Sequence, residues 1–287
     1  MEQNTIKPRR PLSLNGFQLK LIALAIMTID HLAAYDVFPM SDQLYGEMRL
    51  IGRIAAPLFL FMNVEGLRHT RSRAKFLGRM YLACVLIGLT DALMGIALPG
   101  TSAADLINML PTFLYVGVYV CCVEALRSRS KRGTAAAIGA IALSLGCAAL
   151  RVYLGQNGHT ELRQWCNIIL PSPFSVEYSI LFVLLGVAWY LIDDVRINCL
   201  LLLGLSLISR TVPVHIFFSD SFQHIPFLHP DNFTVWHLFT NTQWWMFLAA
   251  APMLMYNGER GHGMKYLFYL YYPLHQYLFI LISIFWK

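Results

Sequence analysis

Ionisable side chains inside long apolar runs are the residues of this sequence best placed to do chemistry. Lys20 and His31 fall in the first run, LKLIALAIMTIDHLAAYDVF, eleven positions apart. In an α-helix this spacing gives a rise of about 16 Å and a net rotation of about 20°. The two side chains therefore share one face. The separation is comparable to the reach of a phosphopantetheine arm, so Lys20 could hold a phosphate of acyl-CoA while the His31 imidazole meets the thioester.

A structural explanation fits the same two residues. A lysine near the end of a membrane helix can extend its ammonium group to the headgroups, and a buried histidine can serve only to hydrogen-bond another helix. The spacing of Lys20 and His31 does not decide between these explanations.

Asp30 precedes His31 but points about 100° away from it around the helix. Its carboxylate is therefore not aimed at the imidazole. We expect Asp30 to pair with Arg53 in the next apolar run, because a buried charge without a partner is expensive. A structural ion pair and a functional one are equally compatible with the sequence.

Further polar residues interrupt other apolar runs at a similar predicted depth. They are Asp91, Glu177, Arg210, His215 and His275. Each can serve interhelical hydrogen bonding, but ionisable groups in membrane helices are costly and commonly mark a pathway or a site. Together they favour a central polar cavity.

The stretch HTRSRAKFLGR (69–79) is a dense basic loop. Such a loop can orient the chain and attract anionic lipids. It can also capture the nucleotide phosphates of CoA, in which case Arg68 and Arg71 lie closest to the membrane.

The elements that must position these residues are transmembrane helices. The 287 residues are 57% hydrophobic and 13% charged, and the mean hydropathy is +0.53, far from the roughly 25% charged residues of soluble domains. A membrane span needs about 20 apolar residues. The nine predicted spans are 17–38, 47–67, 77–98, 106–126, 134–154, 175–194, 197–216, 236–256 and 264–286. We expect an all-α polytopic membrane bundle that forms one domain, 1–287.

Loop charges predict the orientation, because cytoplasmic loops are enriched in Lys and Arg. The segments on one side carry Lys7, Arg9, Arg10, Arg68, Arg71, Arg73, Lys75, Arg79, Arg127, Arg129, Lys131, Arg132, Arg196, Arg260 and Lys265. The other side holds Arg163 and the last residue, Lys287. The N-terminal tail, 1–16, is therefore expected in the cytoplasm and the C-terminus outside, in the cytoplasmic membrane. The tail does not resemble a cleavable signal peptide.

The formal charge of +6 comes without a nucleic-acid motif or an aromatic-interleaved basic patch. The six cysteines show neither a disulfide framework nor metal-ligand spacing. We therefore expect no nucleic-acid partner and no metal.

Three stretches resemble the TraX family, which is associated with N-terminal acetylation of conjugative pilin. They are LKLIALAIMTIDHLA (19–33), RLIGRIAAPLFLFMNVEGLRHTRSRAKFLGR (49–79) and KYLFYLYYPLHQYLFIL (265–281). The spacing of Lys20 and His31 also resembles the Arg/Lys-x10-His motif of membrane acyltransferases that modify cell-surface sugars. The third predicted helix departs from the pattern of related sequences, since IGLTDALMG keeps only Asp91 of an acidic-x-Pro-x-Asp motif.

The resemblance implies roles for the matching residues. His31 would be the catalytic histidine, assisted by Asp30 and Arg53. Lys20, with Arg68 and Arg71, would bind acetyl-CoA. The acceptor-binding residues would be Asp91, His275 and Glu65, with His275 also a candidate to orient His31. Acceptor recognition is further expected within residues 100–260.

The sequence thus favours a membrane acyltransferase that moves an acetyl or other short acyl group from cytoplasmic acyl-CoA to an amine or hydroxyl of a membrane-presented acceptor, either a pilin-like peptide N-terminus or a cell-surface glycan. His31 would be a general base or would form an acyl-histidine. A transporter with an intramembrane charged pathway and a non-enzymatic assembly factor remain alternatives. The oligomeric state is not indicated.

Overall fold

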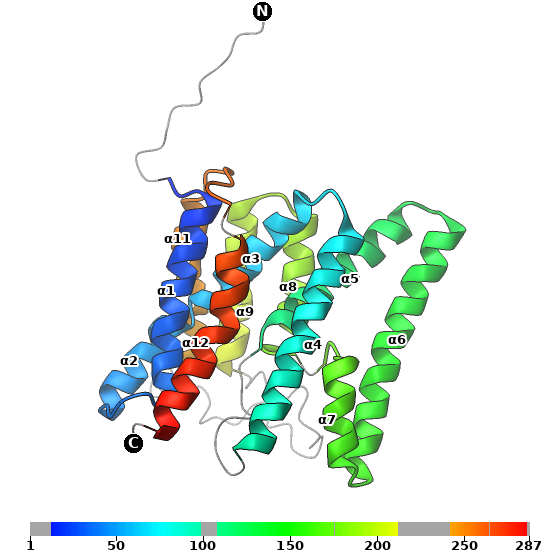
Figure 1. Cartoon of the computed structure of the whole chain (residues 1–287). Coiled ribbons are helices and arrows are strands. Elements are labelled where there is room, and N and C mark those ends of the chain that lie inside the picture. Colours follow the sequence, from blue (N-terminus) through cyan, green and yellow to red (C-terminus); the bar gives the residue numbers. More distant parts are fainter. Residues whose placement is uncertain (1–12, 99–107, 175, 212–241, 264, 286–287) are drawn as a thin grey trace, which may run out of the picture.

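The protein is a bundle of helices that run side by side (Figure 1). The computed structural model describes residues 13–98, 108–174, 176–211, 242–263 and 265–285. The helices are α1 (Gly16–Ala34), α2 (Asp42–Gly52), α3 (Ala55–Arg68), α4 (Arg73–Ala97), α5 (Leu110–Arg127), α6 (Lys131–Gln156), α7 (Thr160–Ile169), α8 (Ser179–Leu191), α9 (Val195–Thr211), the 3-10 helix η4 (Thr242–Ala249), α11 (Ala250–Leu254) and α12 (Lys265–Phe285). Within these ranges the one β-type pairing is a bridge between Leu14 and Tyr256. The predicted all-α class is confirmed.

Five stretches of the described chain are long and apolar enough to cross a membrane. They are α1, the combined stretch of α2 and α3, α4, α5 and α6. Helices α8 and α9 are shorter but apolar, as is the part of α12 from Leu270 onward. Each predicted span contains helix in the part that the structure describes, while residues 212–216 and 236–241 of two spans lie outside that part. The protein is a multi-pass membrane protein.

The stretch from Asp42 to Arg68 is broken in its middle. Pro57 has no N–H, and its ring clashes with the carbonyl four residues earlier in a continuous helix, which here is that of Arg53. The chain tightens at this point, since the amides of Arg53 and Ile54 donate to carbonyls three residues back, at 3.2 Å each. The break ends α2 and places Arg53 beside α1.

Helices α1 and α2 approach each other closely at Gly52. Gly52 is buried, and a β-carbon built on it would lie 2.1 Å from Asp30 Oδ1 and 2.4 Å from Asp30 Cβ. Only glycine therefore permits this spacing between the backbone of α2 and the Asp30 side chain.

A row of polar contacts joins α1 to α12, the first and last described helices. Thr28 Oγ1 lies 2.7 Å from the Tyr271 hydroxyl, and the Tyr35 hydroxyl donates to Gln276 Oε1 at 2.6 Å. Between these two contacts lies His31, whose Nδ1 is 2.7 Å from Nε2 of His275. Residues 28, 31 and 35 lie on one face of a helix because they are three and four positions apart.

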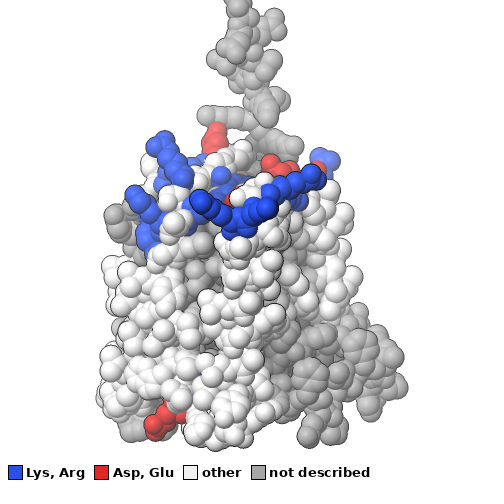
Figure 2. Space-filling model, turned by 90° about the vertical axis from the view of Figure 1, so that its right-hand side faces the viewer, with Lys and Arg blue, Asp and Glu red and all other residues white. Residues whose placement is uncertain are grey.

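Lys and Arg side chains gather at one end of the bundle, the end where α1 begins, while on the face seen in Figure 2 the surface along the helices is largely uncharged. Helices α3 and α5 end there in Arg68 and Arg127, and α4 and α6 begin there with Arg73 and Lys131. We call this the basic end.

Candidate active site

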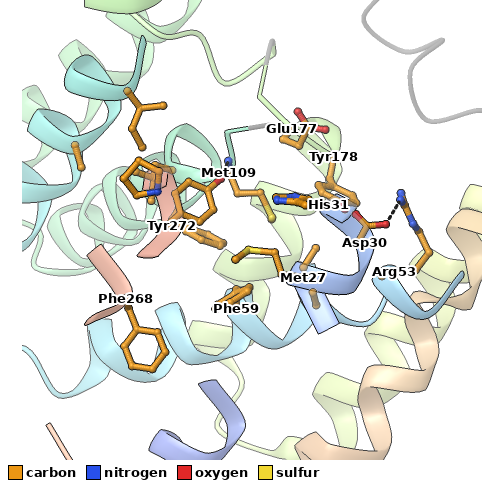
Figure 3. A pocket seen from close by; sticks show the side chains of 18 of the residues that line it. Met27, Asp30, His31, Arg53, Phe59, Met109, Glu177, Tyr178, Phe268 and Tyr272 are labelled. Carbon is orange, nitrogen blue, oxygen red and sulfur yellow. Dashed lines mark hydrogen bonds and ion pairs between the residues drawn. The ribbon is translucent and has the colours of Figure 1, made fainter. Parts of the chain in front are cut away.

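A cavity of about 370 Å³ lies between α1, α2, α3, α4, α5 and α12. Most of its wall is apolar, formed by side chains such as Phe59, Phe113 and Met109. One part of the wall carries ionisable groups instead, and Figure 3 shows several of them projecting together. These groups are Asp30, His31, Arg49, Arg53 and Glu177. Of the residues that predicted a central polar cavity, Glu177 lines this one, whereas Asp91 and His275 are not part of its wall.

Two arginines share the carboxylate of Asp30. Arg49 Nη1 lies 2.8 Å and Arg53 Nη2 lies 3.1 Å from Asp30 Oδ1. Arg53 also donates to the Arg49 carbonyl and to Gln243 Oε1, at 3.0 and 3.1 Å. The predicted pairing of Asp30 with Arg53 is confirmed. Arg49 was not predicted as a partner, although it precedes Arg53 by four residues.

His31 is held through its Nδ1 atom by His275. The two rings are nearly parallel, at 7°, with centroids 5.0 Å apart and the nitrogens 2.7 Å apart. His275 Nδ1 lies 2.7 Å from the carbonyl oxygen of Tyr271. Both histidines are buried.

This chain of contacts determines the tautomer of His31. The Tyr271 carbonyl can only accept, so His275 Nδ1 carries a proton, and Nε2 of neutral His275 is then an acceptor. His31 Nδ1 must therefore donate to it. Neutral His31 consequently has no proton on Nε2, and that lone pair is available as a base.

The segment before α8 places a second carboxylate in the cavity wall. Tyr178 and Ser179 both have left-handed backbones, with φ of 64° and 70°, a conformation that costs a non-glycine residue about 1–3 kcal/mol. The Thr112 hydroxyl donates to the Glu177 carbonyl at 2.9 Å and helps hold the turn. Glu177 and Tyr178 both line the cavity (Figure 3). Within the described residues no cation lies within ion-pair distance of the Glu177 carboxylate.

Lys20 lies toward the basic end of the same helix, outside the cavity wall. Its Nζ is 6.0 Å from the centroid of the Phe268 ring. Phe268 itself lines the cavity. One aromatic ring thus separates Lys20 from the space around His31.

Glu65, Arg68 and Arg71 do not reach the cavity. Arg68 Nη1 pairs with Glu65 and Asp193, at 2.6 and 2.8 Å. Its Nη2 donates to the carbonyls of Trp189, Tyr190 and Ile192 at the end of α8. Arg71 is exposed. The i,i+3 spacing of Glu65 and Arg68 is the signal that could have shown their pairing.

Asp91 also lies outside the wall of this cavity. It lies near Tyr277, where α4 passes α12. Arg210 is in α9, but its side chain is outside the described part of the structure, as are His215 and the tail 1–12.

We expect Arg68→Ala to destabilise the protein and to leave unchanged the CoA binding that the sequence predicts. The substitution leaves the largely buried Glu65 carboxylate without its closest partner, at a cost of about 1–3 kcal/mol. Thermal unfolding in detergent and equilibrium CoA binding measure the two effects. Arg71→Ala is the matched control, because an exposed side chain changes stability by about 0.5 kcal/mol or less. A loss of CoA affinity at unchanged stability would contradict this expectation.

The described fold and cavity define a multi-pass membrane protein with a buried histidine and ionisable groups around a cavity between its helices. The TraX protein family model matches residues 15–284, so the chain belongs to the TraX family. The chain is also similar to a protein of Dichelobacter nodosus named "Probable fimbrial assembly protein FimC, serogroup H1", with 27% identity over 270 residues. The match covers 93% of this chain and 94% of that relative. No solved structure matches the chain.

Proposed function

We propose that this protein is a membrane-embedded acetyltransferase that uses acetyl-CoA from the cytoplasm. The observation that supports this most is His31, whose Nδ1 is bonded to His275 and whose Nε2 is consequently unprotonated beside a cavity. A fixed tautomer of this kind is what a general base requires. Membership of the TraX family, with its association with pilin acetylation, supports the same activity.

The proposed topology has nine spans, with the N-terminus in the cytoplasm and the C-terminus outside. The gathering of Lys and Arg at the basic end supports this orientation, because positive residues are retained on the cytoplasmic side. Acetyl-CoA would then approach from the basic end, near Lys20. His31 lies eleven residues further along α1, so the thioester must enter the membrane to reach it.

In the proposed reaction the acceptor attacks the carbonyl carbon of the acetyl thioester. His31 Nε2 takes the proton that the attacking amine or hydroxyl loses. The tetrahedral intermediate then breaks its carbon–sulfur bond, and the CoA thiolate takes the proton from His31 as it leaves. The products are the acetylated acceptor and free CoA, with His31 returned to its neutral form.

The charged groups of the cavity would serve the same reaction. Arg49 and Arg53 bring positive charge to the wall, which would stabilise the oxyanion that develops on the thioester carbonyl. Glu177 would attract the ammonium form of an amine acceptor and take one of its protons, which leaves the free amine near His31 as the nucleophile. Glu177 would release this proton to solvent after the reaction. A carboxylate at this place favours an amine over a glycan hydroxyl as the acceptor. The name of the Dichelobacter relative, a fimbrial assembly protein, also favours a pilin-like peptide N-terminus.

The test is an acetyl-transfer assay with the purified protein in lipid nanodiscs. Labelled acetyl-CoA would be supplied with either a peptide carrying a pilin-like N-terminus or a glycan acceptor. We expect label transfer to the peptide amine, together with stoichiometric release of CoA. If CoA neither binds nor is consumed with any acceptor, the proposed activity is wrong.

His275→Phe is expected to lower kcat by about tenfold or more and to leave KM for acetyl-CoA unchanged. The loss is smaller than the full general-base contribution of His31, because the His31 ring is still present. Phenylalanine fills the same space but cannot accept the proton of His31 Nδ1, so the His31 tautomer is no longer held. Steady-state kinetics with both substrates measure the split between kcat and KM. His275→Gln, which retains an acceptor oxygen, should recover part of the activity. Equal losses in the two variants, or a change in KM alone, would contradict this positioning role.

A further inference from the structure

A second group of cationic and aromatic side chains lies at the start of α1, on the basic end. It consists of Phe17, Lys20, Arg260, His262 and Phe268, and we call it the rim cluster. Phe17 packs edge-on against both His262 and Phe268, with ring centroids 5.8 and 6.5 Å apart. Lys20 lies near the face of Phe268.

Main-chain hydrogen bonds hold the two halves of the rim cluster together. The segment that follows α11 lies beside the start of α1 (Figure 1). The amides of Gly16 and Phe17 donate to the carbonyls of Glu259 and Arg260, at 2.7 and 3.1 Å. The Asn257 amide donates in return to the Leu14 carbonyl at 3.0 Å. The backbone of Arg260 is therefore fixed next to α1, although its side chain is exposed.

Glycine is required at the next position. Gly261 has φ of 68°, and a β-carbon there would lie 2.5 Å from Oδ1 of Asn15. That oxygen caps α1 by accepting from the amide of Gln18 at 2.9 Å. The turn at Gly261 thus lets the segment lie directly against the helix cap.

The rim cluster carries two cations, Lys20 and Arg260, that have no ion-pair partner among the residues that the structure describes. The Arg260 carbonyl accepts from the amide of Phe17, which lies three residues before Lys20 on α1, so the two cations are neighbours and their charges repel. The neighbouring Glu259 carboxylate accepts from the Asn257 side chain and not from either cation. By contrast, Arg68 and Arg73 at the same end are each paired with a glutamate.

The rim cluster also adjoins the cavity. Phe268 contributes to both, since its ring lies beside Lys20 and it lines the space around His31. Lys20 and His31 are separated by about 16 Å of helix. A ligand with phosphates at one end and a reactive group at the end of a long thin arm would span these two places.

On the basis of the proposed function, we infer that Lys20 and Arg260 bind the phosphate groups of acyl-CoA, and that its pantetheine arm passes Phe268 into the cavity. Two neighbouring cations that have no ion-pair partner in the described chain are suited to phosphate oxygens, which accept charge-assisted hydrogen bonds from both lysine and arginine. The phosphate site is thus built by the start of α1 and residues 255–263, and the paired Arg68 is not part of it.

The test measures the binding of CoA and of adenosine 3′,5′-bisphosphate to the full-length protein in phosphatidylcholine nanodiscs. We expect Lys20→Gln and Arg260→Gln each to lower the affinity for both ligands by about tenfold, because each variant loses one charge-assisted hydrogen bond. Arg127→Gln, an exposed cation at the same end, should bind like the wild type. Lys20→Arg keeps the positive charge and should retain most of the affinity. Its retention would show that Lys20→Gln weakens binding through the lost charge and not through misfolding.

Turnover of S-acetylpantetheine, which lacks the nucleotide phosphates, separates this inference from the proposed function. We expect Lys20→Gln and Arg260→Gln to use it as well as the wild type does. If the wild type binds CoA and both variants bind it equally well, the phosphate site is wrong while the acetyltransferase proposal stands. If the variants differ from the wild type only when phosphatidylglycerol is added to the nanodiscs, the cluster binds lipid headgroups and the inference is likewise wrong. A wild type that binds no CoA overturns both.

Discussion

His31→Ala is expected to lower kcat for acetyl transfer by about 10²–10⁴-fold, the usual contribution of a general base. The acceptor would still bind, and CoA affinity should remain near that of the wild type, because the alanine removes only the group that takes the proton. Initial rates of CoA release and an independent CoA binding measurement give the two quantities. His159→Ala is the matched control, since this histidine is exposed and should leave both quantities unchanged.

The same variant tests whether the acetyl group passes through His31. A rapid-quench experiment with labelled acetyl-CoA and no acceptor should leave the wild-type protein unlabelled if His31 acts only as a base. Stable labelling that His31→Ala abolishes would show an acyl-histidine intermediate instead. Full activity of His31→Ala would exclude both mechanisms.

Among glycine-to-alanine substitutions in the described part of the protein, Gly52→Ala is expected to lower stability the most. The added β-carbon would overlap the Asp30 side chain, whose Oδ1, Cγ and Cβ lie 2.1, 2.3 and 2.4 Å from that position. Helix α2 or Asp30 must move, and overpacking of this kind costs about 1–3 kcal/mol or more. Movement of Asp30 also disturbs its ion pairs with Arg49 and Arg53 and shifts the neighbouring His31. Because a misplacement of about 1 Å can cost about 10²-fold in rate, activity should fall by a similar factor.

Gly46→Ala provides the comparison within the same helix. A β-carbon at Gly46 meets no atom within 4 Å, and alanine favours a helix over glycine by about 1 kcal/mol. Gly46→Ala should therefore be neutral or stabilising, while Gly52→Ala lowers both the melting temperature and the rate. Similar melting temperatures for the two variants would show that α1 and α2 are not packed this closely.

The parts of the site that could be predicted are those governed by a single helix or by charge balance. Lys20 and His31 share a face because of helical geometry alone. The pairing of Asp30 with Arg53 followed from the cost of an unpaired buried charge. Arg49 shares the face of α2 that carries Arg53, so the same argument, applied to residues four apart, would have included it.

The other contacts of the site depend on which helices are neighbours in the bundle. The hydropathy of a segment carries no information about its neighbours. His275 was expected to bind the acceptor or orient His31, but its direct contact with His31 exists because α12 packs against α1. Arg68 was assigned to CoA because it is basic and near the membrane, yet the end of α8 supplies carbonyls that use its donors. The ends of a span are also set by such local contacts: α8 occupies Ser179–Leu191 within the predicted span 175–194, because the chain turns at Tyr178.

The contact between His31 and His275 joins residues 244 positions apart in the chain. A ribosome adds about 5–20 residues per second, so His275 is made about 12–50 s after His31, and α12 is the last described helix to enter the bilayer. During that interval His31 lacks His275, the partner that sets its tautomer in the folded protein. In the proposed function, the His31 tautomer that acetyl transfer needs is thus set only after α12 has been made. A chain that stops before α12 would carry His31 without the partner that fixes this tautomer.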